Sequence, residues 1–508
     1  MEAAVSSGKS YGQILKSSAV IGGSSAVTLV LGMVRAKAIA LLLGPGGYGL
    51  WGICVSIVEL AQGIAGLGLN GSGVRQIAEA VGTGDGQHIA RTVITLRRVS
   101  RALGVVGAVA LAILSGPVAQ FSFGDAKYAP VVAILSLTVL CNIISQGQNA
   151  LLQGLRRIVD MAKDKMLGAT FSTLACIPII YVFREQGIAP ALVLVAAFGV
   201  LTSWFFARRV KVALLPMRAR EVFREAEGLL KLGVVFMMTS LMALGTSYIV
   251  NIILMRRMDQ HAVGLYQAAW LIGGYFAGFI LQAMGTDFYP RLTAVARDHR
   301  QCNQLVNEQL EIGILLAGPG MVATLTFAPW AIRILQSADF LPAVDVLRWI
   351  SLGILLRVIA WPMGFIMLAK NAKKTFFVSE LAFNGLYLTA VWFAVGQWGV
   401  NGVGVAFVGM YAVYVAGVYV ISRCLTGFSW SREAAWIGGS YLALALGVSL
   451  AFYFFTEWVA AILGGVVMTA MGVFSLRKIA AMLPPERFPR PVRTLLTRWG
   501  LMGGSAES

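Results

Sequence analysis

The chain has 508 residues, of which 58% are hydrophobic and 13% are charged, and its mean hydropathy is +0.76. A soluble protein of this length needs far more polar surface, so this composition excludes a soluble globular fold. The net charge of +18 does not indicate nucleic acid as a partner, because the basic residues lie in short loops between apolar stretches, as membrane topology requires.

Apolar stretches of about 20 residues recur along the chain and predict an all-α polytopic membrane protein. The first stretch is not followed by a small-residue cleavage site, so we expect it to be retained rather than removed as a signal peptide. We predict about fourteen transmembrane helices, at residues 14–43, 49–72, 99–121, 128–153, 166–183, 187–206, 230–255, 262–288, 310–335, 345–369, 376–396, 401–424, 436–455 and 458–476.

The basic residues of the connecting loops predict the orientation. If the N-terminus is cytoplasmic, 32 of the 41 lysines and arginines fall in cytoplasmic segments and six in outside segments. Cytoplasmic loops carry the excess of basic residues in membrane proteins. We therefore expect a multi-pass membrane protein with both termini cytoplasmic.

Two segments of the chain repeat each other. The stretch "YGLWGICVSIVELAQGIAGLGLNG" from Tyr48 resembles "VGLYQAAWLIGGYFAGFILQAMGT" from Val263, and "GDAKYAPVVAIL" resembles "QSADFLPAVDVL" further on. An even number of spans separates the copies, so both have one orientation. The repeat predicts two six-helix lobes, at residues 1–207 and 230–424, joined by a basic cytoplasmic link at 208–229. Two more helices at 425–476 and a basic cytoplasmic tail at 477–508 complete the chain.

Nothing in the sequence has the spacing of a metal, nucleotide or catalytic site. The five cysteines are far apart with no CxxC, and the three histidines lie in or beside loops. The short glycine motifs fall in an interhelical turn and at a helix end rather than between a strand and a helix. We expect no cofactor, no metal and no enzymatic activity.

A row of amides marks the fourth predicted span. Its members recur at helical spacing and so share one face: Asn142, Gln146, Asn149 and Gln153. Such a row is costly against lipid, so it faces other helices or a water-filled cavity. Both interpretations, hydrogen bonding between helices and lining of a cavity, remain open. The first span adds a second set of cavity-lining candidates, Ser24, Ser25 and Thr28.

Charged residues inside the apolar spans are the strongest candidates for function. Arg35 and Glu59 lie on opposite sides of the first hairpin at similar predicted depth, so they can form an ion pair that lowers the cost of burying both. Lys37 is nearer the outer surface and is equally well explained as an interfacial anchor. Arg357 falls near the midplane with no acid at its level in its own span, which implies water or an anionic ligand.

The segment "LKSSAVIGGSSAVTLVLGMVRAKAIALLLGPGGYGLWG", followed by "GLGLNGSGVRQIAEA", resembles the N-terminal region of the Wzx-type polysaccharide (O-antigen) flippases. That family is related to the MATE-type multidrug exporters and to MurJ-type lipid flippases. The sequence resemblance is close over about residues 14–80. The remainder of the chain agrees with the family in helix number, duplication and loop charge. It implies a central cavity open alternately to each side and translocation of an undecaprenyl-pyrophosphate-linked glycan. Arg35, Arg357 and Lys37 would then face the anionic head group, with Glu59 as the coupling or ion-pair residue.

Three other functions stay open. An ion-coupled small-molecule exporter of the same superfamily typically uses an acidic site, and Glu59 is the clear carboxylate at mid-membrane depth in this prediction. A membrane scaffold for polysaccharide assembly, working with a polymerase or other assembly proteins, has no need of mid-membrane charges. A ligase or polymerase is expected to carry a large outside loop with catalytic acids or histidines, and the predicted topology has none. Membrane lipids are expected partners in every case.

Overall fold

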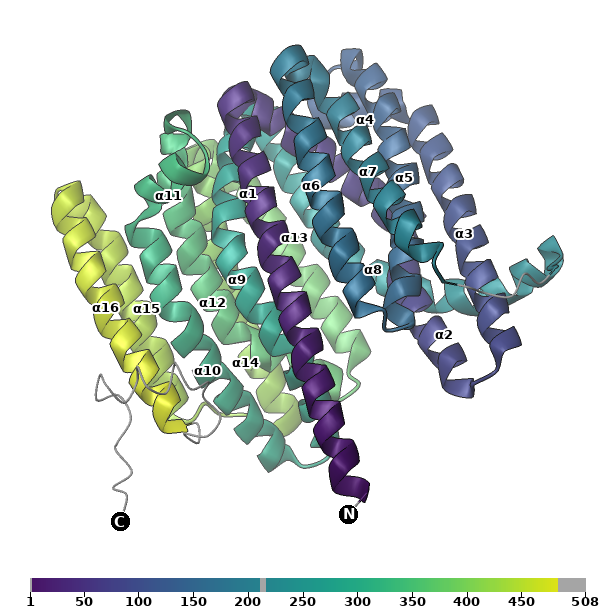
Figure 1. The fold of residues 1–508 in the computed structure, drawn as a ribbon. Helices are drawn as coiled ribbons and strands as arrows, with labels where there is room; N and C mark the ends of the chain where they lie inside the picture. Colours follow the sequence, from purple (N-terminus) through teal and green to yellow (C-terminus); the bar gives the residue numbers. More distant parts are fainter. Residues whose placement is uncertain (1, 211–215, 483–508) are drawn as a thin grey trace. The chain divides into compact units, whose positions relative to one another are not determined.

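The computed structural model describes residues 2–210 and 216–482, with side chains described from Gly22 onward except at some positions between residues 219 and 287. Every regular element in these ranges is helical. The helices α1 to α16, interrupted by three short 3₁₀ helices, succeed one another along the chain (Figure 1). The all-α membrane fold predicted from the hydropathy pattern is confirmed.

The predicted number of membrane spans is not confirmed by helix length and composition. Nine helical segments of the described chain are long and apolar enough to cross a membrane, or up to eleven if each of two bent helix pairs counts as one span. Ile158–Ala207, with 50 residues, contains two of the predicted spans, and Gly22–Ala65, with 44 residues, covers most of the first two. The predicted total of fourteen is therefore not confirmed, because length and composition do not divide these long segments.

The first predicted hairpin turn is a break inside α1 (Glu2–Ala65). Gly44 has φ 64° and ψ −175°, a conformation that a side chain disfavours, and Pro45 follows without a backbone N–H to continue the helix. The two arms of α1 before and after Gly44 correspond to the first two predicted spans. The second arm is shorter than predicted, because Leu67 and Gly68 take positive φ angles and α2 (Leu69–Thr83) begins directly after them.

The internal repeat is visible as a repeated order of helices. In the first copy α3 (Gly86–Ile113) is followed by α4 (Ser115–Phe123), η1 (Ala126–Tyr128) and α5 (Ala129–Gly154). The second copy has the same long helix, short helix, 3₁₀ helix and long helix: α10 (His299–Thr326), α11 (Ala328–Leu335), η3 (Ala338–Ala343) and α12 (Val344–Ala369). The axis of α4 is bent 66° from that of α3.

Two glycines that the repeat aligns also meet in space. A side chain cannot fit on either of them, since a Cβ on Gly49 would lie 1.9 Å from the carbonyl oxygen of Gln260, and a Cβ on Gly264 would lie 1.9 Å from that of Pro45. Glycine permits this close approach of the second arm of α1 to α9 (Gln260–Ala294).

The chain forms two compact units. Unit 1 comprises Met1–Gly264 with Leu335–Ser337, and unit 2 comprises Leu265–Ile334 with Ala338–Ser508. Unit 1 includes α6 (Ile158–Phe183), η2 (Arg184–Gly187), α7 (Ile188–Ala207) and α8 (Ala219–Arg257), and α8 packs against α1 and α2. The lobe boundaries drawn from the repeat, including the link at 208–229, stay a prediction, and the tail lies outside the described residues from position 483.

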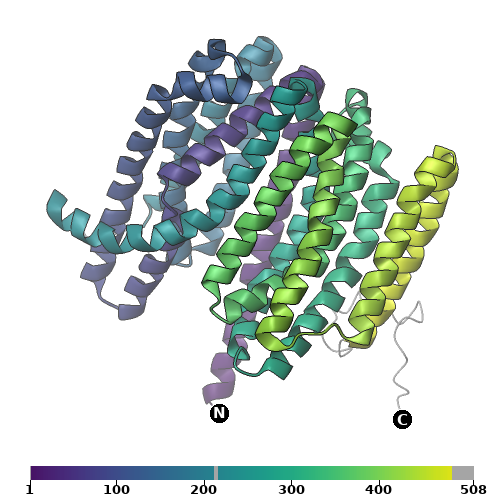
Figure 2. The same ribbon diagram turned by 180° about the vertical axis from the view of Figure 1, so that it is seen from behind.

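Unit 2 is built around α10 and α12. Helices α13 (Lys373–Trp398) and α14 (Asn401–Thr426) pack together, with α12 against α14, and α15 (Arg432–Phe454) and α16 (Glu457–Met482) pack on α10. Figure 2 shows α15 and α16 as the yellow pair of antiparallel helices.

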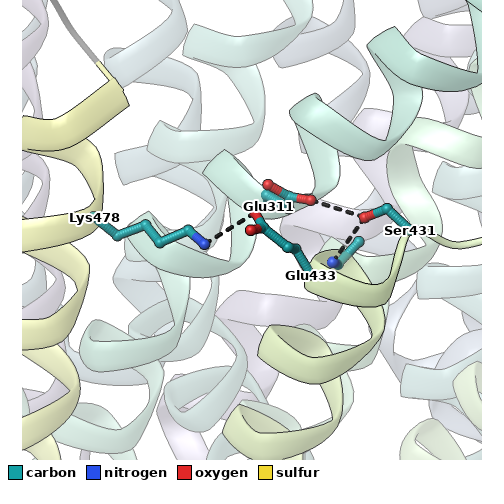
Figure 3. A network of polar contacts seen from close by, with 5 residues as sticks. Glu311, Ser431, Glu433 and Lys478 are labelled. Carbon is teal, nitrogen blue, oxygen red and sulfur yellow. Dashed lines mark hydrogen bonds and ion pairs between the residues drawn. The ribbon is translucent and has the colours of Figure 1, made fainter.

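A polar network holds this C-terminal pair to α10. Ser431 Oγ donates to the buried Glu311 carboxylate over 2.9 Å and accepts a hydrogen bond from the backbone N–H of Ala434, which caps the N-terminus of α15 (Figure 3). Lys478 of α16 pairs with Glu433 at 3.0 Å. The network thus supports helices that have no counterpart in the predicted repeat.

Candidate functional site

Unit 1 contains a polar pocket at the level of Arg35, which we call the N pocket. It encloses about 260 Å³ between the first arm of α1, α5, α6 and α7. Thr28, Gly32 and Arg35 lie one helical turn apart, so a single face of α1 supplies all three. The predicted assignment of Thr28 and Arg35 to a polar cavity is consistent with this geometry.

Arg35 has few partners for its charge. Its Nη1 donates to the hydroxyl of Ser172 on α6 over 3.3 Å, and the side chain is half-buried. Among the ion pairs of the described residues none joins Arg35 to Glu59. The break at Gly44 separates the two arms of α1, and the Arg35 arm packs on α6, so Arg35 faces α6 rather than the second arm.

The acid in the N pocket is Asp164, which the sequence analysis missed. Asp164 is 4% exposed, and its Oδ1 has no hydrogen-bond partner within the described structure. Asn149 and Thr202 lie beside its carboxyl group, and Lys165 lines the same pocket. The predicted span began at residue 166, but α6 begins at Ile158, which moves Asp164 from a loop into the helix. The four-residue spacing of Asp160 and Asp164 was a signal for this earlier start.

The other charged and hydroxyl candidates of α1 are distributed around the helix. Glu59 is exposed on the second arm, and Lys37, two residues from Arg35, is half-buried outside the N pocket lining. Ser24 is buried and its carbonyl accepts from Thr28 Oγ1 at 2.8 Å, whereas Ser25 is exposed. The structure therefore brings Arg35 and Thr28 into one site and leaves Lys37, Glu59, Ser24 and Ser25 outside it.

The amide side chains of the row on α5 lie in two different surroundings, a contact between helices and the N pocket. Asn142 Nδ2 donates to Gln62 Oε1 on the second arm of α1 at 2.9 Å, a hydrogen bond between helices. Asn149 lines the N pocket, and its Oδ1 is buried without a partner in the described part of the chain. Gln146 lies beside Gly66 at the end of α1, and Gln153 is exposed near the end of α5. Each of the two open interpretations applies to part of the row.

The amide row can be tested by labelling. We expect cysteines at Asn142, Gln146 and Asn149 to react with a small charged thiol reagent in at least one conformation, fastest at Asn149 because it lines the N pocket. The five native cysteines are first replaced, and Val139→Cys, fully buried on the same helix, serves as the control that should not react. Failure of all three positions to react would leave only interhelical hydrogen bonding.

Unit 2 contains a second pocket of about 260 Å³, the C pocket, around Arg357 between α12, α13 and α14. Its walls are rich in aromatic rings, and the rings of Trp361 and Phe365, tilted by 60° to each other, have centroids 4.5 Å apart. Tyr411 and Tyr414 line the side toward α14, with centroids 5.6 Å apart. The pocket therefore combines one arginine with flat apolar surfaces and phenol hydroxyls.

An acid from a neighbouring helix also lies in the C pocket. The prediction concerns only the span of Arg357 itself, whereas Glu380 comes from α13. Tyr414 Oη donates to Glu380 Oε1 over 2.7 Å, so the carboxylate is already held by a phenol. No ion pair of the described residues includes Arg357. The arginine thus retains hydrogen-bond donors for another partner.

Known proteins resemble this chain in sequence and fold. The model of a polysaccharide biosynthesis protein family matches residues 38–345. The Lipid III flippase of Escherichia coli K12 is 22% identical over 422 residues, which covers 81% of this chain and 99% of the relative. The solved structure of the lipid II flippase MurJ, in an inward closed conformation, aligns with a TM-score of 0.68 and 16% identity over 90% of this chain and 99% of MurJ.

A multidrug resistance transporter of the MATE family, solved in an inward-facing conformation, aligns with a TM-score of 0.66 and 16% identity over 78% of this chain and 94% of its own. At these identities the solved structures are evidence for the fold. The chain therefore has the fold of these two solved proteins, and it is a multi-pass membrane protein.

Proposed function

The chain belongs to the family of polysaccharide biosynthesis proteins, and on this basis we propose that it is a flippase that moves a lipid-linked glycan across the membrane. Its substrate is undecaprenyl-pyrophosphate-linked oligosaccharide, carried from the cytoplasmic to the periplasmic leaflet of a bacterial inner membrane by alternating access. The match of the chain to nearly the whole length of a lipid III flippase supports the lipid-linked class of substrate.

The observation that carries the proposal is the presence, in each of the two pockets, of one arginine with free hydrogen-bond donors. A pyrophosphate loses much of its hydration in a low-dielectric site, and guanidinium groups offset this loss with charge and paired N–H donors. Arg35 makes one long hydrogen bond to a hydroxyl, and Arg357 has no ion pair in the described structure. Each can therefore bind phosphate without first breaking a strong contact.

The neighbouring groups have distinct roles in this mechanism. Asp164 and Glu380 lower the cost of holding an arginine when no substrate is bound, since each lies in the same pocket as one of them. Asn149 and the hydroxyls of the N pocket hydrogen-bond sugar hydroxyls, and the rings of the C pocket pack against the apolar faces of the sugar. The lipid tail stays in the bilayer while the head group passes.

Proteoliposomes test the proposed substrate class. We expect purified protein to move a fluorescent polyprenyl-pyrophosphate-linked sugar between leaflets, while a cationic dye of the kind that multidrug exporters carry is not transported. Quenching of the fluorophore by a membrane-impermeant reductant measures the leaflet. Transport of the dye without movement of the lipid would favour the alternative, a small-molecule exporter with an acidic site.

The topology is a further prediction. We expect Ser508 and the 208–231 segment to be cytoplasmic, because 32 of the 41 basic residues fall on that side and six on the other. Ser508 and residues 211–215 lie outside the described structure, so fusions decide this point. An alkaline phosphatase fusion should be inactive and a fluorescent protein fusion bright at both positions. Phosphatase activity at either would contradict the topology.

A further inference from the structure

The surface of unit 1 carries an arginine-lined groove apart from the N pocket. It encloses about 420 Å³ over α5, between α3 and α7, helices that run alongside one another in Figure 1. Arg97 and Arg101 of α3 and Arg208 at the end of α7 line one part of it. Ile144, Val200 and Leu201 line the other part, so the groove has a cationic end and an apolar end.

Within the part of the chain that the structure describes, no carboxylate forms an ion pair at the cationic end. The three helices that build the groove, α3, α5 and α7, contain no Asp or Glu. Glu225 of α8 accepts a hydrogen bond from Thr95 of α3, and neither residue lines the groove. Among the described residues no ion pair includes Arg97, Arg101 or Arg208. Three uncompensated arginines at one site favour a ligand with negative charge.

The arginines are held in place by neutral groups. Arg97 is half-buried and its Nη2 donates to the carbonyl of Ala207 at the C-terminus of α7, over 2.9 Å. Arg101 Nε donates to the carbonyl of Arg97 at 3.1 Å, and the Arg208 guanidinium lies 4.6 Å from the centre of the Trp204 ring. These contacts use few of the five N–H donors of each guanidinium, so donors remain for phosphate oxygens.

The surroundings of the groove are those of a lipid-facing surface. Val105, Val106 and Val109 of α3 and Leu201 and Phe205 of α7 are exposed apolar side chains on the same helices. Trp204 is half exposed at the cationic end, the position that tryptophan prefers at a membrane–water interface. A ligand that satisfies both ends of the groove has an anionic head and an apolar chain.

We propose that the groove of Arg97, Arg101 and Arg208 binds the head group of an anionic phospholipid of the adjacent leaflet, with an acyl chain against Ile144, Val200 and Leu201. This is a different site from the N pocket, because the two share none of their lining residues. With the proposed topology the leaflet is the cytoplasmic one, but the lipid class follows from the groove itself and does not depend on the transport function.

Native mass spectrometry of the full chain tests the proposal, with phosphatidylglycerol and phosphatidylcholine as probes. We expect the wild type to retain phosphatidylglycerol in preference to phosphatidylcholine, and Arg97→Ala/Arg101→Ala to lose this affinity by roughly 10-fold to 100-fold, as for charge-assisted hydrogen bonds. Arg91→Ala removes an exposed arginine of the same helix outside the groove and should bind like the wild type. Equal retention by the double variant and the wild type would overturn the site.

A second variant and a competitor keep the test independent of folding and of the substrate. Val200→Trp fills the apolar end and keeps every charge, so it should also lose phosphatidylglycerol while the thermal unfolding temperature in detergent stays near the wild-type value. Undecaprenyl pyrophosphate should compete without selectivity. The fraction of bound phosphatidylglycerol that it displaces should match its fraction of the total anionic lipid. Selective displacement by undecaprenyl pyrophosphate, lost with the double variant, would instead assign the groove to the transported lipid.

Discussion

Arg35→Ala should abolish export of lipid-linked polysaccharide, and removal of a neighbouring acid should not restore it. If Arg35 only compensates a buried carboxylate, breaking the pair costs about 3–5 kcal/mol but removing both charges is nearly neutral. The structure makes Asp164 the acid in the same pocket, so Arg35→Ala/Asp164→Asn joins Arg35→Ala/Glu59→Gln as the decisive double variant. We expect both double variants to insert into the membrane and to remain inactive, because the phosphate of the head group no longer has the Arg35 guanidinium to bind.

The measurement is surface polysaccharide in cells that lack their own flippase, with protein level checked by blot. Arg35→Lys should retain part of the activity, since lysine keeps the charge and loses the paired donors. Arg91→Ala, an exposed arginine of the same unit, is the matched control and should export normally. Normal export from either double variant would reject a role of Arg35 in binding the head group.

Arg357→Ala should abolish export as well, with Arg357→Lys partly active. The C pocket would lose its sole basic residue among the described lining, while Glu380 would remain held by Tyr414 at 2.7 Å. Loss of one charge-assisted contact weakens binding by about 1.5–3 kcal/mol, roughly 10-fold to 100-fold in affinity. The negative charge of Glu380, which remains in the pocket without a basic residue beside it, repels the anionic head group and makes the loss larger.

A double variant again separates the two explanations. If Arg357 serves only to compensate Glu380, then Arg357→Ala/Glu380→Gln should export like the wild type; we expect it to remain inactive. Arg333→Ala removes an exposed arginine of unit 2 and should leave export unchanged. The thermal unfolding temperature of each purified variant distinguishes a binding defect from misfolding. Wild-type export from Arg357→Ala itself would eliminate the C pocket from the mechanism.

The sequence by itself determined the membrane class, the helical architecture and the duplication. These depend on properties that the order of residues alone shows, without knowledge of contacts. They are the length of an apolar stretch, the presence of Gly44 and Pro45 between two stretches, and the similarity of segments about 210 residues apart. The charge of the loops predicts the orientation for the same reason. Span edges were less reliable, since polar residues such as Asp164 extend α6 by several residues beyond its apolar stretch.

Only the tertiary structure decided which charged residues line the same pocket. The sequence placed Arg35 opposite Glu59 by counting depth along one hairpin, but the first arm of α1 packs on α6, and Asp164 occupies the pocket instead. In the same way Glu380 reaches the pocket of Arg357 from the next helix. Depth can be counted along a helix, whereas the direction that a side chain faces depends on which helices pack around it. The packing of the helices around each arginine therefore decides which polar groups share its pocket.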